Sequence, residues 1–102
     1  MTYSVSFHPR AYEEYLGLRR EDREDFEHAI QRLREHPFRG GPGFVVEKLA
    51  GSSELWKLKL RRPQRRAYYR VQGNHLRLLG FGPRPDFYLK LLDKARLSPH
   101  ES

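Results

Sequence analysis

The chain has 102 residues, enough for a single domain over residues 1–102 with one modest core, and its 20 Lys and Arg residues outnumber 13 Asp and Glu residues, giving a net charge of +7. A domain this basic is expected to bind a polyanion or an acidic protein, because each phosphate contact releases counterions. The chain has no cysteine, no signal-peptide pattern and no apolar run of about 18 residues, which excludes a disulfide framework and a thiolate zinc site and predicts a cytoplasmic protein without membrane contact.

The N-terminal part predicts a strand followed by two helices. Thr2 to Phe7 alternates apolar with small polar residues, which is the period-two pattern of a strand. His8-Pro9 begins a first helix, because proline suits the first helical position. A second helix is expected from Arg20 to His36, with apolar residues at i, i+3, i+4 and i+7, namely Phe26, Ala29, Ile30 and Leu33. The mixed-charge run Arg19 to Asp25 predicts a solvated helix surface.

The next segment predicts a loop and a short extended element. Phe38 to Gly43 is rich in glycine but lacks the spacing of a phosphate-binding loop, so it is interpreted as a connector. Phe44 to Leu49 fits either a short strand or an extended lead-in. Gly51, Ser52 and Ser53 then predict a turn.

Glu54 to Val71 predicts a basic hairpin. Apolar residues alternate with Lys57, Lys59 and Arg61 in its first half and with Arg66, Tyr68 and Arg70 in its second half, and Pro63 between them ends strand pairing. The two strands then share an apolar face and a basic face. Same-face residues lie about 6.7 Å apart along a strand and neighbouring strands about 4.8 Å apart, so the cations are expected to form a patch about one nucleotide wide. Such a patch suits an anion site or a solubilising face that protects the strand edge.

The remaining chain completes an α+β fold. His75 to Phe81 predicts the last strand, with leucines on both faces, and Asp86 to Arg96 predicts a short helix before a flexible tail at 97–102. The expected fold is a short N-terminal strand, a two-helix hairpin, an antiparallel sheet of three to four strands with the helices on one face, and a short C-terminal helix.

Several motifs in this order resemble the RelE/ParE superfamily of bacterial and archaeal type II toxins. They are F-x-x-x-A from Phe7 to Ala11, a helix pair closing at His36-Pro37, K-L-x-G from Lys48 to Gly51, the W-K-L-K-L strand, R-x-x-Y-R-V from Arg66 to Val71, and the late Gly82, Arg84 and Tyr88. The similarity covers Tyr3 to Leu92. It implies a RelE/ParE toxin-like fold for the whole chain.

The ribonuclease branch of this family cleaves messenger RNA in the ribosomal decoding site. It uses two lysines on one strand, an arginine on the next, a further arginine and a C-terminal tyrosine. The resemblance assigns these catalytic roles to Lys57, Lys59, Arg66, Arg84 and Tyr88. Arg61 matches an additional basic residue of some members, and Tyr68 and Arg70 are expected to contact RNA. The complete set favours this branch over the gyrase-poisoning ParE branch.

The residue types also suit RNA cleavage by 2′-OH attack without a metal or cofactor. No pair of histidines, and no histidine with a glutamate, falls on the basic face, but neighbouring positive charge lowers a lysine's pKa and makes a neutral amine base accessible. Either lysine is a candidate for the base or a phosphate clamp, and Arg66 for a bidentate phosphate ligand. Arg84 is a candidate for leaving-group protonation or charge neutralisation, and Tyr88 for base stacking. His75 or Glu54 remains an alternative acid or base. The five histidines show no metal-ligand spacing.

The resulting hypothesis is a type II toxin that cleaves messenger RNA on the ribosome and is silenced by a cognate antitoxin with an acidic-apolar segment. One alternative is a ParE-like inhibitor whose target is DNA gyrase. Another is a catalytically inactive basic member of the fold.

Overall fold

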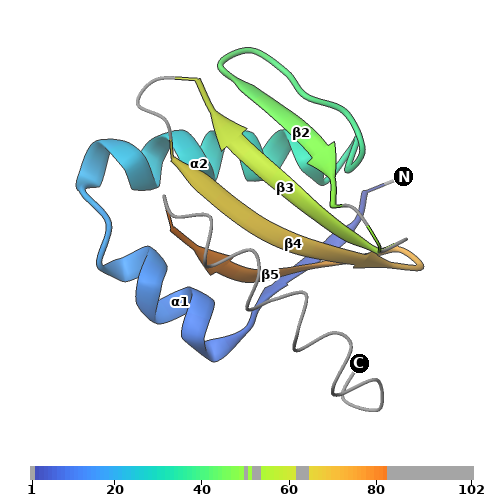
Figure 1. The fold of residues 1–102 in the computed structure, drawn as a ribbon, viewed down its shortest axis with the longest axis horizontal. Coiled ribbons are helices and arrows are strands. Elements are labelled where there is room, and N and C mark those ends of the chain that lie inside the picture. The colour runs from blue at the N-terminus through green and yellow to red at the C-terminus, as the bar shows by residue number, and fades with distance from the viewer. Residues whose placement is uncertain (1, 50, 52–53, 62–64, 83–102) are drawn as a thin grey trace.

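The computed structural model describes residues 2–49, 51, 54–61 and 65–82, and over this part the chain has an α+β fold (Figure 1). Strand β1 (Ser4–Phe7) precedes helices α1 (Pro9–Leu16) and α2 (Arg20–Leu33). Strands β2 (Phe44–Lys48), β3 (Leu55–Leu60), β4 (Arg66–Gln72) and β5 (His75–Phe81) follow. The predicted order of a strand, two helices and a run of antiparallel strands is confirmed. The helix predicted from Asp86 to Arg96 and the tail from 97 to 102 lie outside the described residues.

The strands form one five-stranded sheet in the order β1-β5-β4-β3-β2. Neighbours among β2 to β5 are antiparallel, and Phe44–Lys48 is a full strand at one edge, which decides between the two interpretations of that segment. The N-terminal strand lies at the other edge, parallel to β5. This parallel pairing was not predicted, because it joins segments about seventy residues apart and no local pattern reports it.

Both helices cover the same face of the sheet and enclose the core (Figure 1). The predicted apolar stripe of α2 is buried there, with Phe26 and Leu33 fully enclosed. It packs against leucines of β3 and β5 and against Ala67 and Tyr69 of β4. The helix ends at Leu33, three residues before the predicted His36, because the chain then turns and both Glu35 and His36 donate backbone hydrogen bonds to the Arg32 carbonyl. Within the described residues, no helix is long and apolar enough to cross a membrane.

The strand faces differ from simple alternation in two places. Leu55 and Tyr68 lie on the face opposite the helices yet are 2% and 1% exposed. In β5, Leu76, Leu78 and Phe81 all enter the core, although a period of two would place Phe81 outside. A register shift explains this change, since Gly80 pairs with Tyr68 while Leu78 pairs with Tyr69. Such a bulge moves the following residues to the other face.

Candidate functional site

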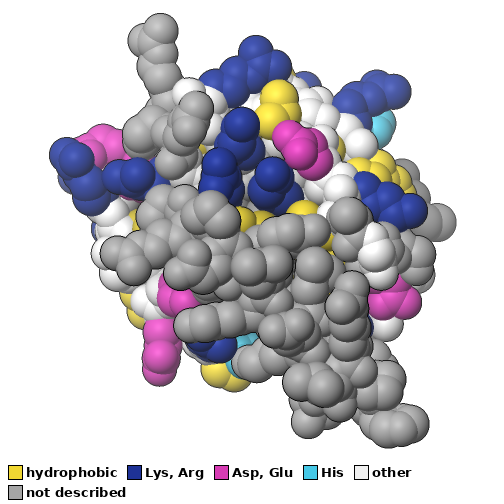
Figure 2. All heavy atoms as spheres, in the orientation of Figure 1, with side chains coloured by type: hydrophobic (Ala, Val, Ile, Leu, Met, Phe, Trp, Pro, Cys, Tyr) yellow, Lys and Arg dark blue, Asp and Glu magenta, His cyan; other side chains and the backbone are white. Residues whose placement is uncertain are grey.

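The candidate site is the outer face of β3 and β4, opposite the helices. Lys57 and Lys59 project from β3 and Arg66 from β4, and the register makes Lys59 the direct partner of Arg66 and Lys57 the direct partner of Tyr68. Opposed residues on neighbouring strands have Cβ atoms about 5 Å apart, so Lys59 and Arg66 begin side by side. Figure 2 shows Lys and Arg side chains gathered over these strands, with an acidic side chain beside them. The predicted clustering of the strand cations is therefore present.

Two carboxylates compensate part of this charge. Lys57 Nζ lies 3.4 Å from Glu47 Oε2, across the β2–β3 pair where the two residues are direct partners. Arg70 Nε lies 3.2 Å from Glu54 Oε2, an ion pair without hydrogen-bond geometry at this nitrogen. In the part of the chain that the structure describes, Lys59 has no carboxylate within ion-pair distance. Of the two lysines of β3, Lys59 is thus the one without a carboxylate partner among the described residues, and it can attract an anion.

The other predicted RNA contacts differ in exposure. Arg61 follows β3 and is exposed, and its backbone N–H donates to the Gly43 carbonyl at 3.0 Å, which fixes this end of the strand on the preceding loop. Arg70 is half-buried beside Glu54. Tyr68, however, is almost fully buried, so its ring offers no stacking surface in this arrangement. An RNA-binding role for Tyr68 stays a prediction that requires the ring to be uncovered.

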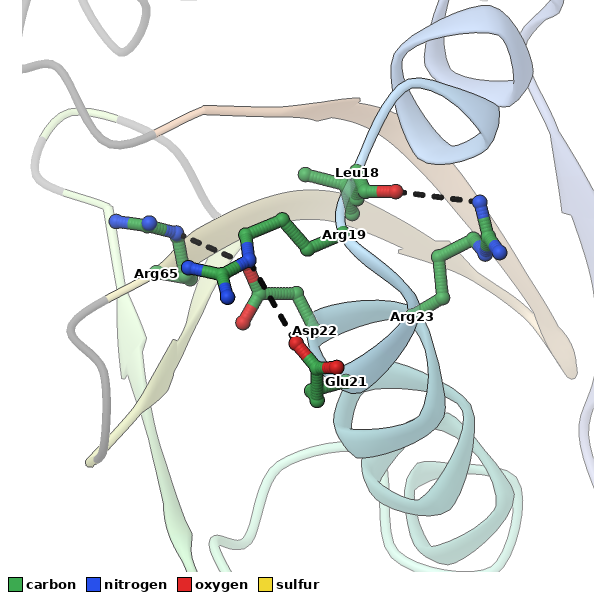
Figure 3. Close-up of polar contacts among 6 residues, drawn as sticks. All are labelled: Leu18, Arg19, Glu21, Asp22, Arg23 and Arg65. Atoms are coloured by element: carbon green, nitrogen blue, oxygen red, sulfur yellow. Dashed lines mark hydrogen bonds and ion pairs between the residues drawn. The ribbon is translucent and has the colours of Figure 1, made fainter.

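An ion pair that no local sequence pattern predicted anchors the basic strands to the helix layer. Asp22 of α2 has a side chain only 5% exposed, and its Oδ2 accepts a hydrogen bond of 3.2 Å from Arg65 Nε (Figure 3). The Arg65 carbonyl in turn accepts from the Leu60 N–H at 2.9 Å. Arg65 directly precedes Arg66, so this pair holds the start of β4 in place. The run Arg19 to Asp25 was predicted to be a solvated surface, and Asp22 is its buried exception.

The alternative acid and base candidates lie away from Lys59 and Arg66. Glu54 is engaged with Arg70 and accepts from Gln72 Nε2 at 3.2 Å. His75 is the partner of Gln72 on β5. Gln72 lies six residues along β4 from Arg66, which corresponds to roughly 20 Å of strand. Neither alternative is therefore supported by the strand geometry.

Comparison with solved structures finds bacterial and archaeal toxins. A variant of the E. coli toxin RelE in the free state aligns with a TM-score of 0.76 and 24% identity, over 92% of this chain and 98% of that one. The intact E. coli RelBE toxin-antitoxin complex aligns with a TM-score of 0.68 and 26% identity, over 80% of this chain and 96% of the matched chain. The archaeal RelE-RelB complex from Pyrococcus horikoshii OT3 aligns with a TM-score of 0.64 and 26% identity, over 83% of this chain and 98% of the matched chain. This chain belongs to the RelE/ParE superfamily.

Membership of the RelE/ParE superfamily rests on structure and motif order, since no protein-family model and no curated protein matches the sequence. The α+β fold predicted from the resemblance is confirmed over the described residues. Two assigned site residues, Arg84 and Tyr88, lie outside those residues. In the described part, no group of three or more His, Asp or Glu side chains is arranged to hold a metal ion. What the structure presents for chemistry is the pair Lys59 and Arg66, with Lys57 beside them.

Proposed function

We propose that this RelE/ParE-superfamily protein is the toxin of a type II toxin-antitoxin system and that it acts as a ribosome-dependent messenger RNA endonuclease. The observation that supports this proposal most is the pairing of Lys59 with Arg66 on the outer face of the sheet, where no carboxylate of the described residues lies at ion-pair distance from Lys59. RelE toxins and RelBE complexes are among the structural neighbours, which supports a toxin. The neighbours give no comparable support to the gyrase alternative.

The proposed reaction is attack of a ribose 2′-OH on the adjacent phosphorus. A base takes the 2′-OH proton, the bond from phosphorus to the 5′-oxygen breaks, and an acid protonates that oxygen, leaving a 2′,3′-cyclic phosphate. Lys59 and Arg66 are assigned to the phosphate, where positive charge and the planar guanidinium stabilise the developing dianion. Lys57 or Lys59 is the candidate base. Arg84 is proposed to serve the leaving oxygen and Tyr88 to stack on a base.

The proposed partner in the cell is an antitoxin protein. Several structural neighbours were solved with RelB antitoxins, including the E. coli and Pyrococcus complexes. The net charge of +7 would attract an acidic segment electrostatically. An antitoxin that covers the cations of β3 and β4 would block RNA directly. Coexpression with a small acidic protein encoded next to this gene should restore growth of cells that produce the toxin.

The test is induction of the protein in bacteria while growth and messenger RNA 5′ ends are followed. The wild type should arrest growth and produce new 5′ ends within translated messages. Lys59→Ala and Arg66→Ala should each lower cleavage by about 10²-fold or more, as expected when one transition-state charge contact is removed. Arg20→Ala is the matched control, since it removes one cation from an exposed pair with Glu24 on α2 and should cleave normally.

The other outcomes select between the alternatives. Full cleavage by folded Lys59→Ala or Arg66→Ala would refute the site. Growth arrest without new 5′ ends, together with inhibited DNA supercoiling by purified protein, would support a gyrase target instead. Absence of both arrest and cleavage would identify an inactive member of the fold.

A further inference from the structure

A second polar cluster lies on the same outer face, at the edge formed by β1 and β5. Ser4 and Ser6 of β1 are the direct partners of His75 and Arg77 of β5. Ser4 Oγ lies 2.6 Å from His75 Nδ1, and Ser6 Oγ lies 2.7 Å from His75 Nε2. Arg77 donates from a terminal guanidinium nitrogen to Ser6 Oγ at 3.1 Å. One connected hydrogen-bond chain therefore orients these four side chains.

These hydrogen bonds orient the Arg77 side chain without neutralising its charge. Its partner is the Ser6 hydroxyl, and within the described residues no carboxylate lies at ion-pair distance from the Arg77 guanidinium. A guanidinium has five N–H donors, and the contact with Ser6 uses one of them. Ser6 in turn is fixed by His75. Arg77 is thus a positioned cation with donors and charge available to an anion.

Arg77 also lies next to another cation. It is the direct partner of Arg70 across β4 and β5, and Arg70 in turn pairs with Glu54. Like charges opposed on a sheet repel, so an anion bound beside these two residues would relieve this cost. Arg70 lies four residues along β4 from Arg66 and on the same face, which corresponds to about 13 Å. A few nucleotides of single-stranded RNA would cover that distance.

We propose that Arg77, with Arg70 and the Ser6 hydroxyl, forms a phosphodiester-binding subsite that guides the RNA strand across the sheet, away from the phosphate held by Lys59 and Arg66. This inference rests on the proposed function for its ligand. Charge and donors at Arg77 supply the affinity, and the chain through Ser6 and His75 supplies the orientation. The subsite binds backbone and therefore favours no base sequence.

The subsite predicts that Arg77 contributes to the binding of long RNA strands and not to the binding of short ones. The probes are fluorescent 2′-O-methyl RNA strands of about three and about nine nucleotides, which lack the attacking hydroxyl and span the scissile site alone or both sites. Arg77→Ala should weaken binding of the longer strand about three- to tenfold and reduce the slope of log affinity against log salt by about 0.7, the value for one lost contact to a single strand. The short strand should bind as tightly as it does to wild type.

Matched variants separate the subsite from charge and folding. Arg20→Ala removes the same charge from the helix layer and should bind both strands like wild type. Arg77→Lys keeps the charge and should retain most of the affinity that Arg77→Ala loses. Equal thermal unfolding temperatures establish that each variant is folded. Binding of the longer strand by folded Arg77→Ala at wild-type strength, or an equal loss for both strands, would overturn the subsite.

The outcome is distinguishable from failure of the proposed function. The binding assay uses an RNA that cannot be cut, so it reports on the Arg77 subsite even if induced protein cuts no messenger RNA. A length-dependent loss at Arg77 without cellular cleavage would support the subsite and refute the endonuclease. Cellular cleavage that depends on Arg66, together with RNA binding that does not change in Arg77→Ala, would support the endonuclease and refute the subsite.

Discussion

Replacing Tyr69 by phenylalanine tests the buried hydrogen bond that joins β4 to the segment after α2. The Tyr69 hydroxyl donates to the Pro37 carbonyl at 2.6 Å, and the residue is 0% exposed. The substitution keeps the ring but leaves the buried carbonyl without this donor, which costs about 1 to 2 kcal/mol of unfolding free energy at neutral pH. For a domain of this size, each kcal/mol lowers the melting temperature by about 4 to 8 °C.

The destabilisation caused by the same substitution should shrink at alkaline pH. Burial raises the pKa of Tyr69 well above its ordinary value of 10. The unfolded chain therefore loses this proton near pH 10 while the folded chain retains it, and stability falls as pH rises. By pH 11 the wild type has lost about 1.4 kcal/mol through this group, since the unfolded phenol is then about ten-elevenths ionised. Tyr69→Phe loses none of this free energy, so the two proteins should become about equally stable near pH 11.

Urea titrations followed by Trp56 fluorescence between pH 7 and about pH 11 measure both effects. Burial also raises the pKa of Tyr15, but this contribution is the same in both proteins and cancels in the difference. An equal stability of wild type and Tyr69→Phe at neutral pH would refute the hydrogen-bond contribution. A difference that stays constant to pH 11 would refute retention of the phenol proton in the folded chain.

Two further substitutions test elements that position the site. Asp22→Asn removes the negative charge that holds Arg65 and should lower the free energy of unfolding in urea by about 1 to 2 kcal/mol. This is less than the cost of breaking a fully buried ion pair, because the Arg65 side chain is one-third exposed. A loss as small as that of the exposed control Glu24→Gln, about 0.5 kcal/mol or less, would contradict the role of Asp22 as an anchor. Gly73→Ala places a side chain at φ +57° in the β4–β5 turn, and although no atom lies within 4 Å, melting curves should show a loss of about 1 kcal/mol. An unchanged melting temperature would show that the turn adopts another conformation.

Local patterns predicted the elements because each pattern follows from backbone geometry within one segment. The spacing from Phe26 to Leu33 matches 3.6 residues per turn and identified α2, and alternation in Glu54 to Val71 matches the pleat and identified β3 and β4. Alternation also placed Lys59 and Arg66 on one face. Their direct pairing required the hairpin register, which the sequence left undetermined.

The same reasoning missed what depends on distant partners. Asp22 belongs to a run that is otherwise exposed, and only the position of Arg65 explains its burial. Glu47 compensates Lys57 because β2 joins β3 in one particular register. The bulge between β4 and β5 moved Phe81 into the core against its parity. These outcomes reflect packing across the sheet rather than propensity along it.

By itself, the sequence determined the class of fold, the order of its elements, the excess of positive charge and the residues of the basic strands. Periodicity and composition are properties of short segments, so they can be recognised without knowing which other segment packs against them. The tertiary structure alone decided which cations are compensated and which are not, and it brought Ser6 of β1 to Arg77 of β5, about seventy residues later. The physical reason is that pairing between distant segments is chosen by the burial of the whole core, which no local pattern contains.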